Sequence, residues 1–400
     1  MRLRTYESFW LIKNGLLYSY PLLEKNINTS IAVIGGGITG ALISDALVQA
    51  GYKVVLLDKR DIGQGSTSAT TSMLQYEVDT PLTELSGMIG EKEAAYCYSQ
   101  GRTSIHELEK LVKKYRIHCD FQKKRSLYFA HNKKAALRLR KEFDIRDKYA
   151  LGVQWLTPAQ VRSAYGIICE GAILSDTAAS VDAYRLAHEL IQHNIKKGME
   201  VYDQTEIVKM NFRGRRPQLT TAEGCVVRCD KVIFCTGFES TLMLKEKVAD
   251  LFFTYASISE PGAKVKKELP GTLVWNTADP YLYMRTTGDG RIIVGGEDTD
   301  THVEEGQQKK KEKAAVRLQK KLEQTIPGIH FIEDFSWSGT FGSTKDGLPY
   351  IGASPEYKNA IFVLGFGGNG ITFSVQGRKI VTDLLEGREN KLAYYYRFGR

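Results

Sequence analysis

The stretch Ile31-Ala32-Val33-Ile34-Gly35-Gly36-Gly37-Ile38-Thr39-Gly40 decides the fold of this chain. Its four apolar residues predict a buried strand, and a glycine-rich turn follows directly. A helix that stops at Gly51 comes next, and then a second buried strand, Val54-Val55-Leu56-Leu57-Asp58. The order of strand, G-x-G-x-x-G turn, helix and strand is typical of a βαβ unit that binds a dinucleotide.

The residues of this unit have separate physical roles. Gly35 permits the tight turn off the strand, Gly37 lets a pyrophosphate lie against bare backbone, and Gly40 lets the helix pack closely. The helix N-terminus offers free N–H groups and a partial positive charge to phosphates. Asp58 is placed to accept hydrogen bonds from ribose hydroxyls. The alternative for the same residues is a helix–strand turn that binds no nucleotide.

Length and composition describe an ordinary globular protein. The chain has 400 residues, of which 42% are hydrophobic and 25% charged, so we expect two or three domains. No stretch approaches the roughly 18 consecutive apolar residues that a membrane helix needs. Lys13 and Asn14 interrupt the apolar segment near the N-terminus, which we do not interpret as a signal peptide. The default location is therefore the cytoplasm.

Charge and cysteine content indicate neither a nucleic-acid partner nor a metal. The net charge of +9 is concentrated in Lys133–Lys141 and Lys309–Lys321, which are typical of solvated helix faces. The six cysteines lack the spacing of a zinc site or a disulfide framework, so we expect free thiols and no metal.

Apolar periodicity predicts further elements along the chain. Helices are expected from Glu91 to Tyr115, from Lys133, from Val181-Asp182, over the second lysine-rich run, and after the last glycine-rich turn. Strands are expected at Ser126–Ala130, Val232–Gly237, Thr254–Ser259, Gly271–Thr277, Tyr281–Arg285 and Arg291–Val294, and the segments Gly339–Gly352 and Ile361–Leu364 lead into the last glycine-rich turn. The segment from Met1 to Thr29 is expected to pack on the outside.

Four separated motifs carry a resemblance that spans about Ile31 to Gly387. They are Gly35–Gly40 with Asp58, Gly63–Ser68, Cys235-Thr236-Gly237, and Thr344–Gly352 followed by Gly365–Thr372. In this order and spacing, the chain resembles the D-amino-acid oxidase, glycine oxidase and sarcosine oxidase family of FAD-dependent oxidoreductases.

The resemblance implies an α/β fold, α+β overall, with a discontinuous Rossmann-like FAD-binding domain and an inserted antiparallel-sheet substrate domain. Residues 29–90, 165–245 and 335–400 are assigned to the FAD-binding domain. Residues 91–164 and 246–334 are assigned to the substrate domain, and residues 1–28 to an N-terminal extension.

FAD is the expected cofactor, bound non-covalently. Gly339 stands where sarcosine oxidases carry the cysteine that attaches flavin, and residues 66–72 contain no histidine. The N–H groups of residues 367–370 are expected to face the flavin pyrimidine edge. The residues predicted to contact FAD are Gly35, Gly37, Ile38, Thr39, Gly40, Asp58, Lys59, Gly65, Ser66, Thr67, Ser68, Ile207, Thr236, Gly237, Gly367, Gly368, Asn369, Gly370, Ile371 and Thr372.

The resemblance implies hydride transfer from the carbon beside a neutral amine to the flavin, which gives an imine. Oxygen or a quinone would then reoxidise the flavin. Glycine and D-amino-acid oxidases bind the substrate carboxylate with an arginine, but Phe341 stands in its place here. A simple α-amino acid substrate is therefore in doubt, and we expect an amine or amino-acid-like compound.

The candidate catalytic residues are Tyr281, Tyr283, Arg285 and Glu77. The first three share one face of a strand and could hold a carboxylate or a carbonyl, with Tyr281 matching a substrate-facing tyrosine of D-amino-acid oxidase. The alternative is an outward polar face. Glu77 could orient a cationic amine, whereas Asp79 is expected to cap the helix that begins near residue 81.

The histidines have no convincing partners in sequence and are expected to be structural or exposed. They are His106, His118, His131, His188, His193, His302 and His330. Two further functions stay open: an FAD-dependent oxidoreductase acting on a modified tRNA base, and a flavoprotein without turnover. A nicotinamide dehydrogenase is contradicted by the C-terminal glycine-rich turn, which a flavin needs.

Overall fold

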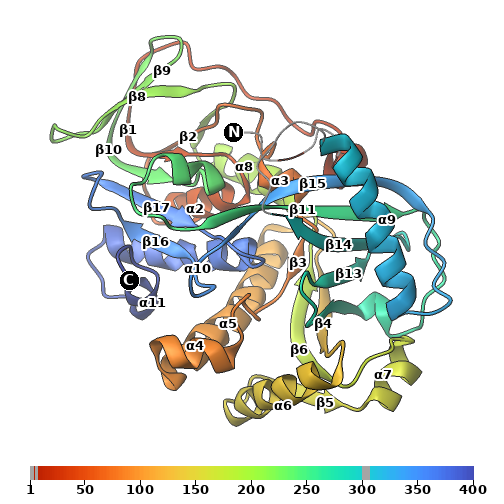
Figure 1. Ribbon diagram of the computed structural model, residues 1–400. Coiled ribbons are helices and arrows are strands. Elements are labelled where there is room, and N and C mark those ends of the chain that lie inside the picture. Colours follow the sequence, from red (N-terminus) through yellow and green to blue (C-terminus); the bar gives the residue numbers. More distant parts are fainter. Residues whose placement is uncertain (1–3, 5–7, 300–306) are drawn as a thin grey trace.

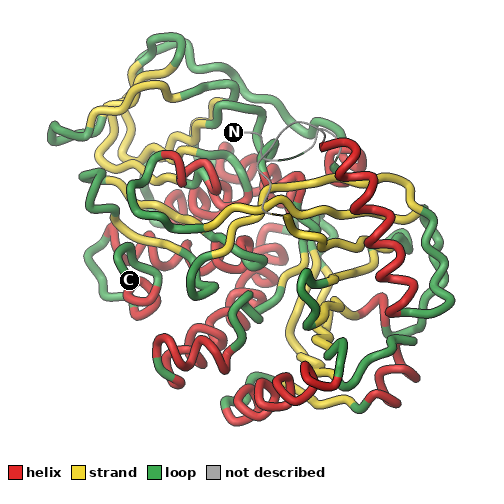
Figure 2. The backbone as a smooth tube through the Cα atoms, in the orientation of Figure 1, coloured by secondary structure: helices red, strands yellow, loops and turns green. Residues whose placement is uncertain are grey.

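Two β-sheets organise the chain, and helices cover their outer faces (Figures 1 and 2). The structure is a computed structural model that describes residue 4 and residues 8–299 and 307–400. Its mixed α/β architecture, with one mostly parallel sheet and one mostly antiparallel sheet, confirms the expected fold class.

The first sheet contains the βαβ unit predicted from the glycine-rich stretch. The strands of its main path, in spatial order, are β16 (Tyr350–Ala353), β17 (Ala360–Leu364), β10 (Val226–Phe234), β1 (Ile27–Ile34), β2 (Val54–Leu57) and β7 (Glu200–Tyr202). The pairs from β17 to β7 are parallel, while β16 runs antiparallel to β17. A hairpin of β8 (Ile207–Asn211) and β9 (Gln218–Thr221) extends β10.

Both faces of the first sheet are buried, as the apolar run at its centre predicts. Ile31 and Val33 belong to a core that includes buried residues of several helices, whereas Ala32 points to a second core on the other face. The longest of these helices are α2 (Ile38–Gln49), α5 (Glu91–Tyr115), α8 (Ala183–Ile195) and α10 (Gly370–Leu385).

The second sheet is assembled from segments that lie far apart in the sequence. In spatial order its strands are β15 (Glu333–Ser343), β11 (Asp250–Ser259), β14 (Ile292–Thr299), β13 (Leu282–Thr286), β12 (Thr272–Asn276), β4 (Gln122–Phe129), β6 (Ala172–Ser180) and β3 (Met73–Leu74), and β5 (Val153–Leu156) also pairs with β6. The strand pairs are antiparallel, except that β12 runs parallel to β4.

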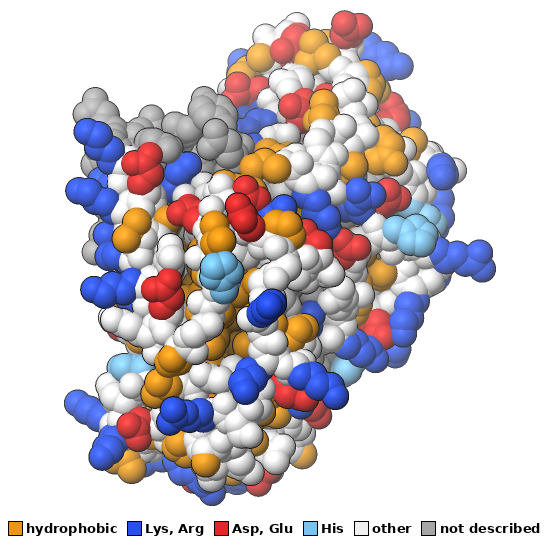
Figure 3. All heavy atoms as spheres, turned by 90° about the vertical axis from the view of Figure 1, so that its right-hand side faces the viewer, with side chains coloured by type: hydrophobic (Ala, Val, Ile, Leu, Met, Phe, Trp, Pro, Cys, Tyr) orange, Lys and Arg blue, Asp and Glu red, His pale blue; other side chains and the backbone are white. Residues whose placement is uncertain are grey.

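One face of the second sheet packs on helices. Leu127, Val274 and Met284 share a core with α7 (Pro158–Tyr165) and α9 (Gln307–Thr325). The lysine-rich run therefore forms the expected helix: α9 buries Leu318 and exposes basic side chains, which gather along the left edge of the face in Figure 3. Because successive side chains along a strand point to opposite faces, the residues directly before and after these core residues in each strand face the first sheet.

The remaining elements are short or cover the edges of the sheets. They are α1 (Phe9–Asn14), α3 (Ser66–Ala69), α4 (Leu82–Ile89), α6 (Lys133–Lys148), η1 (Gly237–Leu242), η2 (Leu269–Gly271) and α11 (Lys391–Tyr395). Within residues 8–29 the structure contains one short helix, α1, which buries Phe9 and Trp10 against the second sheet and exposes Ile12 and Lys13. No helix in the described ranges is both long enough and apolar enough to cross a bilayer.

Three strands lie in a different sheet from the one implied by the expected domain segments. β3 falls within residues 29–90, β6 falls within residues 165–245 and β15 overlaps residues 335–400, yet all three pair in the second sheet. After β6, the chain returns to the first sheet at β7. The division into two domains stays a prediction, and in it we now place β3, β6 and β15 with the substrate domain.

Candidate functional site

A large cavity, with a volume of about 1030 Å³, extends between the two sheets. At one end it is lined by the turns after β1, β2 and β10 of the first sheet. At the other end it is lined by the inward faces of β11, β13 and β15 of the second sheet. The loop over residues 65–79 and the turn over residues 365–371 form its sides.

The glycine-rich turn after β1 approaches other backbone too closely for side chains. Gly35 has a φ of +104°, and a Cβ atom there would lie 2.5 Å from the carbonyl oxygen of Cys235. A Cβ atom on Gly37 would lie 2.8 Å from Thr67 Oγ1, while one on Gly40 would lie 1.8 Å from the Gly35 carbonyl oxygen. The turn therefore presents bare backbone to the cavity, as pyrophosphate binding requires.

The hydroxyl-rich loop after β2 is tied to the N-terminus of α2. The Ile38 N–H donates a 2.9 Å hydrogen bond to Thr67 Oγ1, and Ser66 lines the cavity. Ser68 is fully buried and donates to the Gly65 carbonyl at 3.0 Å. Ser66 and Thr67 thus face the cavity, whereas Ser68 shapes the loop.

Asp58 holds the end of β2 at the same end of the cavity. Its carboxylate accepts hydrogen bonds from the N–H groups of Gly36 at 2.6 Å and Arg60 at 2.9 Å. Burial raises the pKa of Asp58 to about 6, although these two N–H donors oppose the shift. The neighbouring cations are already paired, because Lys59 and Arg60 contact Glu239 at 3.0 and 2.8 Å.

The last glycine-rich turn faces the cavity from the N-terminus of α10. Asn369 donates a 2.8 Å hydrogen bond to the Gln75 carbonyl, and the Gly367 N–H donates to the Gly342 carbonyl at 2.7 Å. Thr372 is buried and donates to the same Gln75 carbonyl at 3.2 Å. These bonds join the turn to the loop after β3 and to β15.

All but three of the residues predicted to contact FAD line the cavity. The exceptions are Gly40, Ser68 and Thr372, which pack or hold backbone behind its wall. The lining residues are Gly35, Gly37, Ile38, Thr39, Asp58, Lys59, Gly65, Ser66, Thr67, Ile207, Thr236, Gly237, Gly367, Gly368, Asn369, Gly370 and Ile371. The bare glycine turn, the helix N-termini and the length of the cavity fit an extended dinucleotide, and contact of each residue with FAD stays a prediction.

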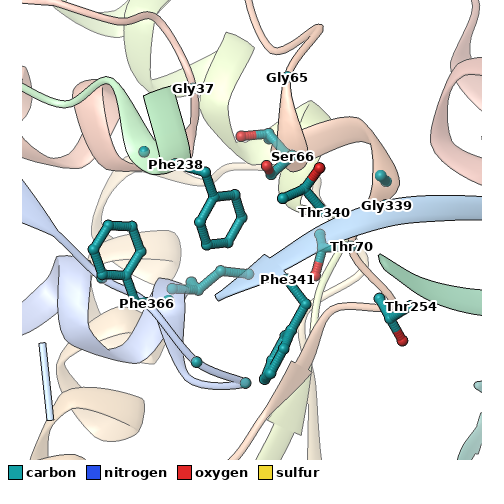
Figure 4. Close-up of a pocket in the computed structure, with 18 of the residues that line it drawn as sticks. Gly37, Gly65, Ser66, Thr70, Phe238, Thr254, Gly339, Thr340, Phe341 and Phe366 are labelled. Atoms are coloured by element: carbon teal, nitrogen blue, oxygen red, sulfur yellow. The ribbon is translucent and has the colours of Figure 1, made fainter. Parts of the chain in front are cut away.

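The opposite end of the cavity is an aromatic chamber. Tyr128 and Trp275 stack with ring centroids 3.6 Å apart, and Tyr281 and Tyr283 lie with centroids 5.6 Å apart. Figure 4 shows Phe341 entering the cavity from β15. We missed Tyr128 and Trp275 in the sequence, although the period-two alternation of their strands with buried Leu127 and Val274 is the signal that points to them.

Between the two ends, Figure 4 shows the rings of Phe238 and Phe366 side by side, with Ser66 and Thr70 opposite them on the loop after β2. The two phenyl rings are stacked, with centroids 5.4 Å apart and planes 12° apart. They form an apolar wall along the middle of the cavity.

Arg285 shares a strand face with Tyr283 but does not line the cavity. It is buried, with only 4% of its surface exposed, and its Nε donates a 2.6 Å hydrogen bond to the Thr71 carbonyl. Its guanidinium lies over the Trp10 ring, 5.4 Å from the centroid. The structure therefore places Arg285 behind the cavity wall, where it holds the loop over residues 65–79 and does not reach the cavity.

Three consecutive carbonyls of that loop are held in the same way. Trp337 Nε1 donates to the Ala69 carbonyl at 2.7 Å, and Trp10 Nε1 donates to the Thr70 carbonyl at 2.6 Å. With the bond from Arg285 to the next carbonyl, donors from β13, β15 and α1 position the backbone that faces the expected cofactor.

Glu77 is among the residues that line the cavity, but its side chain lies in a buried ion pair. Its Oε1 accepts from the Ser175 hydroxyl at 2.7 Å and lies 3.6 Å from Arg146 Nη1, and its side chain has no exposed surface. Arg146 in turn contacts Glu142 at 2.7 Å. The structure thus gives Glu77 a structural partner, and its contact with a bound amine stays a prediction.

The expectation that Asp79 caps helix α4 is wrong. The N-terminus of α4 is capped by Glu142, which accepts from the N–H groups of Leu82 and Thr83, both at 2.9 Å. Asp79 instead accepts a 3.2 Å hydrogen bond from the Gly368 N–H. Asp79 is exposed to the cavity. The protein that surrounds the cavity nevertheless desolvates its carboxylate, and this desolvation, with a contribution from the charge of Asp298, raises the pKa of Asp79 to about 6.

Two further carboxylates line the chamber, Asp279 and Asp298, and the sequence did not identify them. Asp298 lies at the end of β14 and Asp279 in the connection between β12 and β13. Burial raises the pKa of Asp298, and the charge of Asp279 adds to this rise. Neither residue belongs to a motif, since only the pairing of β13 with β14 brings them to the cavity.

None of the described histidines lines the cavity, and His302 lies outside the described residues. Within the described part of the chain, no group of three or more His, Cys, Asp or Glu side chains is placed to hold a metal ion. Cys235 lines the cavity, and burial raises the pKa of its thiol.

A family model described as DAO, FAD dependent oxidoreductase, matches residues 30–384. Glycine oxidase of Geobacillus kaustophilus (strain HTA426) is 25% identical over 376 residues, which cover 90% of this chain and 93% of the relative. The crystal structure of glycine oxidase from Geobacillus kaustophilus superimposes with a TM-score of 0.76 at 21% identity, over 93% of this chain and 99% of that chain.

Two other relatives have different names. The putative Rieske 2Fe-2S iron-sulfur protein YhfW of Bacillus subtilis (strain 168) is 24% identical over 392 residues, covering 96% of this chain and 74% of the relative. Gamma-glutamylputrescine oxidoreductase of Escherichia coli (strain K12) is 24% identical over 386 residues, covering 92% of this chain and 86% of the relative.

Proposed function

The chain belongs to the DAO family of FAD-dependent oxidoreductases, and on that premise we propose that it oxidises a carbon–nitrogen bond of a small amine or amino-acid-like compound. The observation that carries the proposal is one continuous cavity, which joins the glycine-rich dinucleotide end to an aromatic chamber. FAD, when bound, accepts the hydride from the carbon that bears the amine, leaving an imine that water hydrolyses.

The chamber would orient the substrate and exclude water. Burial raises the pKa of Tyr283 to about 12 and that of Tyr281 well above its ordinary value, so both phenols stay protonated at neutral pH and can donate hydrogen bonds. The rings of Tyr128, Trp275 and Phe341 supply apolar surface around the reacting carbon. Positioning against the cofactor and a dry chamber are what this chemistry requires of a protein.

An amine is favoured over an α-amino acid by the charges of the chamber. Among the cavity-lining residues that the structure describes, the lysine and arginine side chains are Lys59 and Arg60, and both lie at the Asp58 end, where they pair with Glu239. Phe341 stands where an arginine would hold a carboxylate. One relative, gamma-glutamylputrescine oxidoreductase, carries the name of an amine compound, which agrees with this preference.

The test is anaerobic mixing of the purified holoprotein with a panel of primary and secondary amines and α-amino acids. Loss of the oxidised flavin absorbance near its visible maximum, with the imine-derived carbonyl product recovered in equal amount, is the expected result. A flavin that stays oxidised with every compound would instead support a flavoprotein without turnover. We further propose oxygen or a quinone as the electron acceptor and the cytoplasm as the location.

A further inference from the structure

A row of paired residues crosses the second sheet on the face that lines the cavity. Tyr128 on β4 pairs with Trp275 on β12, and Trp275 pairs with Tyr283 on β13. Tyr283 in turn pairs with Gly295 on β14. Paired residues of neighbouring strands point to the same face of a sheet, and the three aromatic residues line the cavity. In this row, three aromatic side chains are therefore followed by a position that has no side chain.

The missing side chain of Gly295 lets the Tyr283 ring lie across β14. A Cβ atom on Gly295 would lie 2.3 Å from Tyr283 Cζ and 2.4 Å from its hydroxyl oxygen. The far end of the phenol therefore rests on the glycine backbone and covers it, and Gly295 is not among the residues that line the cavity. Gly295 is also not among the glycines with a positive φ, so this position needs a glycine for space and not for backbone conformation.

The Trp275 ring beside Tyr283 is held in place at one face and at its edge. Its face stacks on Tyr128, with centroids 3.6 Å apart and planes 7° apart. Its Nε1 donates a 3.0 Å hydrogen bond to Ser126 Oγ, which also accepts from Gln75 Nε2 at 3.1 Å. Among the described residues, no ring other than that of Tyr128 stacks on Trp275. The stack and the hydrogen bond thus fix the plane of the indole before a ligand binds.

Because the Tyr283 ring lies over β14, the second face of Trp275 stays open. Neighbouring strands are only about 4.7 to 4.9 Å apart, so an upright Tyr283 ring would stack on Trp275 as Tyr128 does from the other side. Both Trp275 and Tyr283 are partly exposed, although burial raises the pKa of Tyr283 to about 12. Their open surface therefore faces the cavity and not bulk water. The result is a slot whose wall is the indole face and whose floor is the phenol ring.

The shape and chemistry of this slot fit a flat apolar group. Aromatic rings pack against the faces and edges of other rings, and such pairs contribute more than the area they bury. Phe252 and Phe341, paired on β11 and β15, add two more rings to the same cavity. A saturated ring of the same size is thicker and has no π-system, so it cannot contact the wall and the floor as closely.

We propose that this slot holds an aromatic ring of the substrate, which makes arylalkylamines the substrate class, and that Gly295 is the specificity-determining residue that keeps the slot open. This inference rests on the proposed function but goes beyond it, since it names the substrate class. Burying a phenyl group corresponds to a factor of roughly 10 to 150 in affinity, and ring–ring contact adds a factor of about 2 to 10.

The first experiment compares three primary amines by anaerobic stopped-flow reduction of the holoenzyme: 2-phenylethylamine, 2-cyclohexylethylamine and ethylamine. We expect 2-phenylethylamine to reduce the flavin with a second-order rate constant at least about tenfold above that of ethylamine and about 2- to 10-fold above that of 2-cyclohexylethylamine. Equal rate constants for 2-phenylethylamine and ethylamine, or a preference for the saturated ring, would overturn the inference while leaving amine oxidation intact.

A binding measurement separates this inference from the proposed function. The trimethylammonium derivatives of 2-phenylethylamine and 2-cyclohexylethylamine have no nitrogen lone pair to react, so they report recognition alone through perturbation of the bound flavin spectrum. The two ions have the same charge and chain length and differ only in the ring. Tighter binding of the phenyl ion supports the inference even if no amine reduces the flavin. Equal or absent binding of both ions counts against it.

Variants assign the preference to the slot. Gly295→Ala places a methyl group where the Tyr283 ring lies, so the ring must lift from β14 and fill space beside Trp275. The ratio of the rate constants for 2-phenylethylamine and ethylamine should then fall at least about tenfold. Gly271→Ala is the matched control, because Gly271 directly precedes β12 outside the cavity and an added Cβ atom there meets nothing within 4 Å.

A second variant keeps the test decisive if Gly295→Ala folds poorly. Trp275→Leu removes the flat wall of the slot and should lower the same ratio, while Ser126 keeps its hydrogen bond from Gln75. A ratio that equals that of the Gly271→Ala control, in whichever of the two variants folds, would refute the assignment of the slot.

Discussion

Replacing Gly37 by alanine tests whether the first glycine-rich turn holds the cofactor by close approach. Gly37 has a φ of −77°, which any residue adopts, so the substitution introduces no backbone strain. The only structural consequence is the added methyl group, whose Cβ atom would lie 2.8 Å from Thr67 Oγ1. The variant therefore isolates the steric role of this glycine.

The size of the effect follows from two contacts. An ordinary contact of about 3.4 Å requires Thr67 Oγ1 to move by about 3.4 − 2.8 = 0.6 Å, which lengthens its 2.9 Å bond from the Ile38 N–H to the limit of a hydrogen bond. That bond is lost with or without FAD, so its cost of about 1 kcal/mol lowers the stability of the protein. Crowding at the pyrophosphate costs about 1 to 2 kcal/mol of binding free energy, which predicts FAD affinity lower by roughly 5- to 30-fold.

The assay is a titration of the apoprotein with FAD, in which the quenching of flavin fluorescence reports binding. Gly87→Ala is the control, because Gly87 lies in helix α4 and an added Cβ atom there meets nothing within 4 Å. It should bind FAD with the affinity of the unmodified protein. A dissociation constant for Gly37→Ala within about twofold of that control would refute the proposed contact between this turn and the cofactor.

Three further predictions follow from the same cavity. Trp10→Phe removes the donor to the partly buried Thr70 carbonyl, so it should lower the free energy of unfolding by about 1 to 3 kcal/mol in urea titrations of the holoprotein and speed FAD release. An unchanged release rate would contradict the positioning role of α1. Arg285→Met should weaken FAD retention and leave the ranking of amine substrates unchanged, because the guanidinium donates to the Thr71 carbonyl behind the cavity wall. A changed ranking with normal FAD content would instead support the predicted contact of Arg285 with substrate. Burial, with the charge of Asp298, raises the pKa of Asp79 to about 6, so this cavity-lining carboxyl is charged above that pH and neutral below it. The affinity of the holoprotein for butyltrimethylammonium, measured by perturbation of the bound flavin spectrum, should therefore fall as pH drops through 6. Asp79→Asn should remove this step, and a step that persists in the variant would assign it to another group.

The βαβ unit and most elements could be read from the sequence because their signals are local. The apolar run before Gly35 is buried on both faces of the first sheet, and α5 spans Glu91–Tyr115 as its periodicity predicts. Asp182 caps α8 by accepting from the Arg185 N–H, as expected at a helix start. In each case, neighbouring residues carry the pattern, so no tertiary contact is needed to infer it.

The sequence by itself determined where the dinucleotide end of the cavity lies, because close backbone approach at a glycine-rich turn is a property of consecutive residues. Only the tertiary structure decided which side chains line the aromatic end of the cavity. The alternation along β13 placed Tyr283 and Arg285 on one face. The contacts of Arg285 with the Thr71 carbonyl and the Trp10 ring nevertheless hold its side chain behind the cavity wall. Likewise, the chamber becomes acidic through contacts between remote segments, because the charge around a side chain is set by its neighbours in space and not by those in sequence.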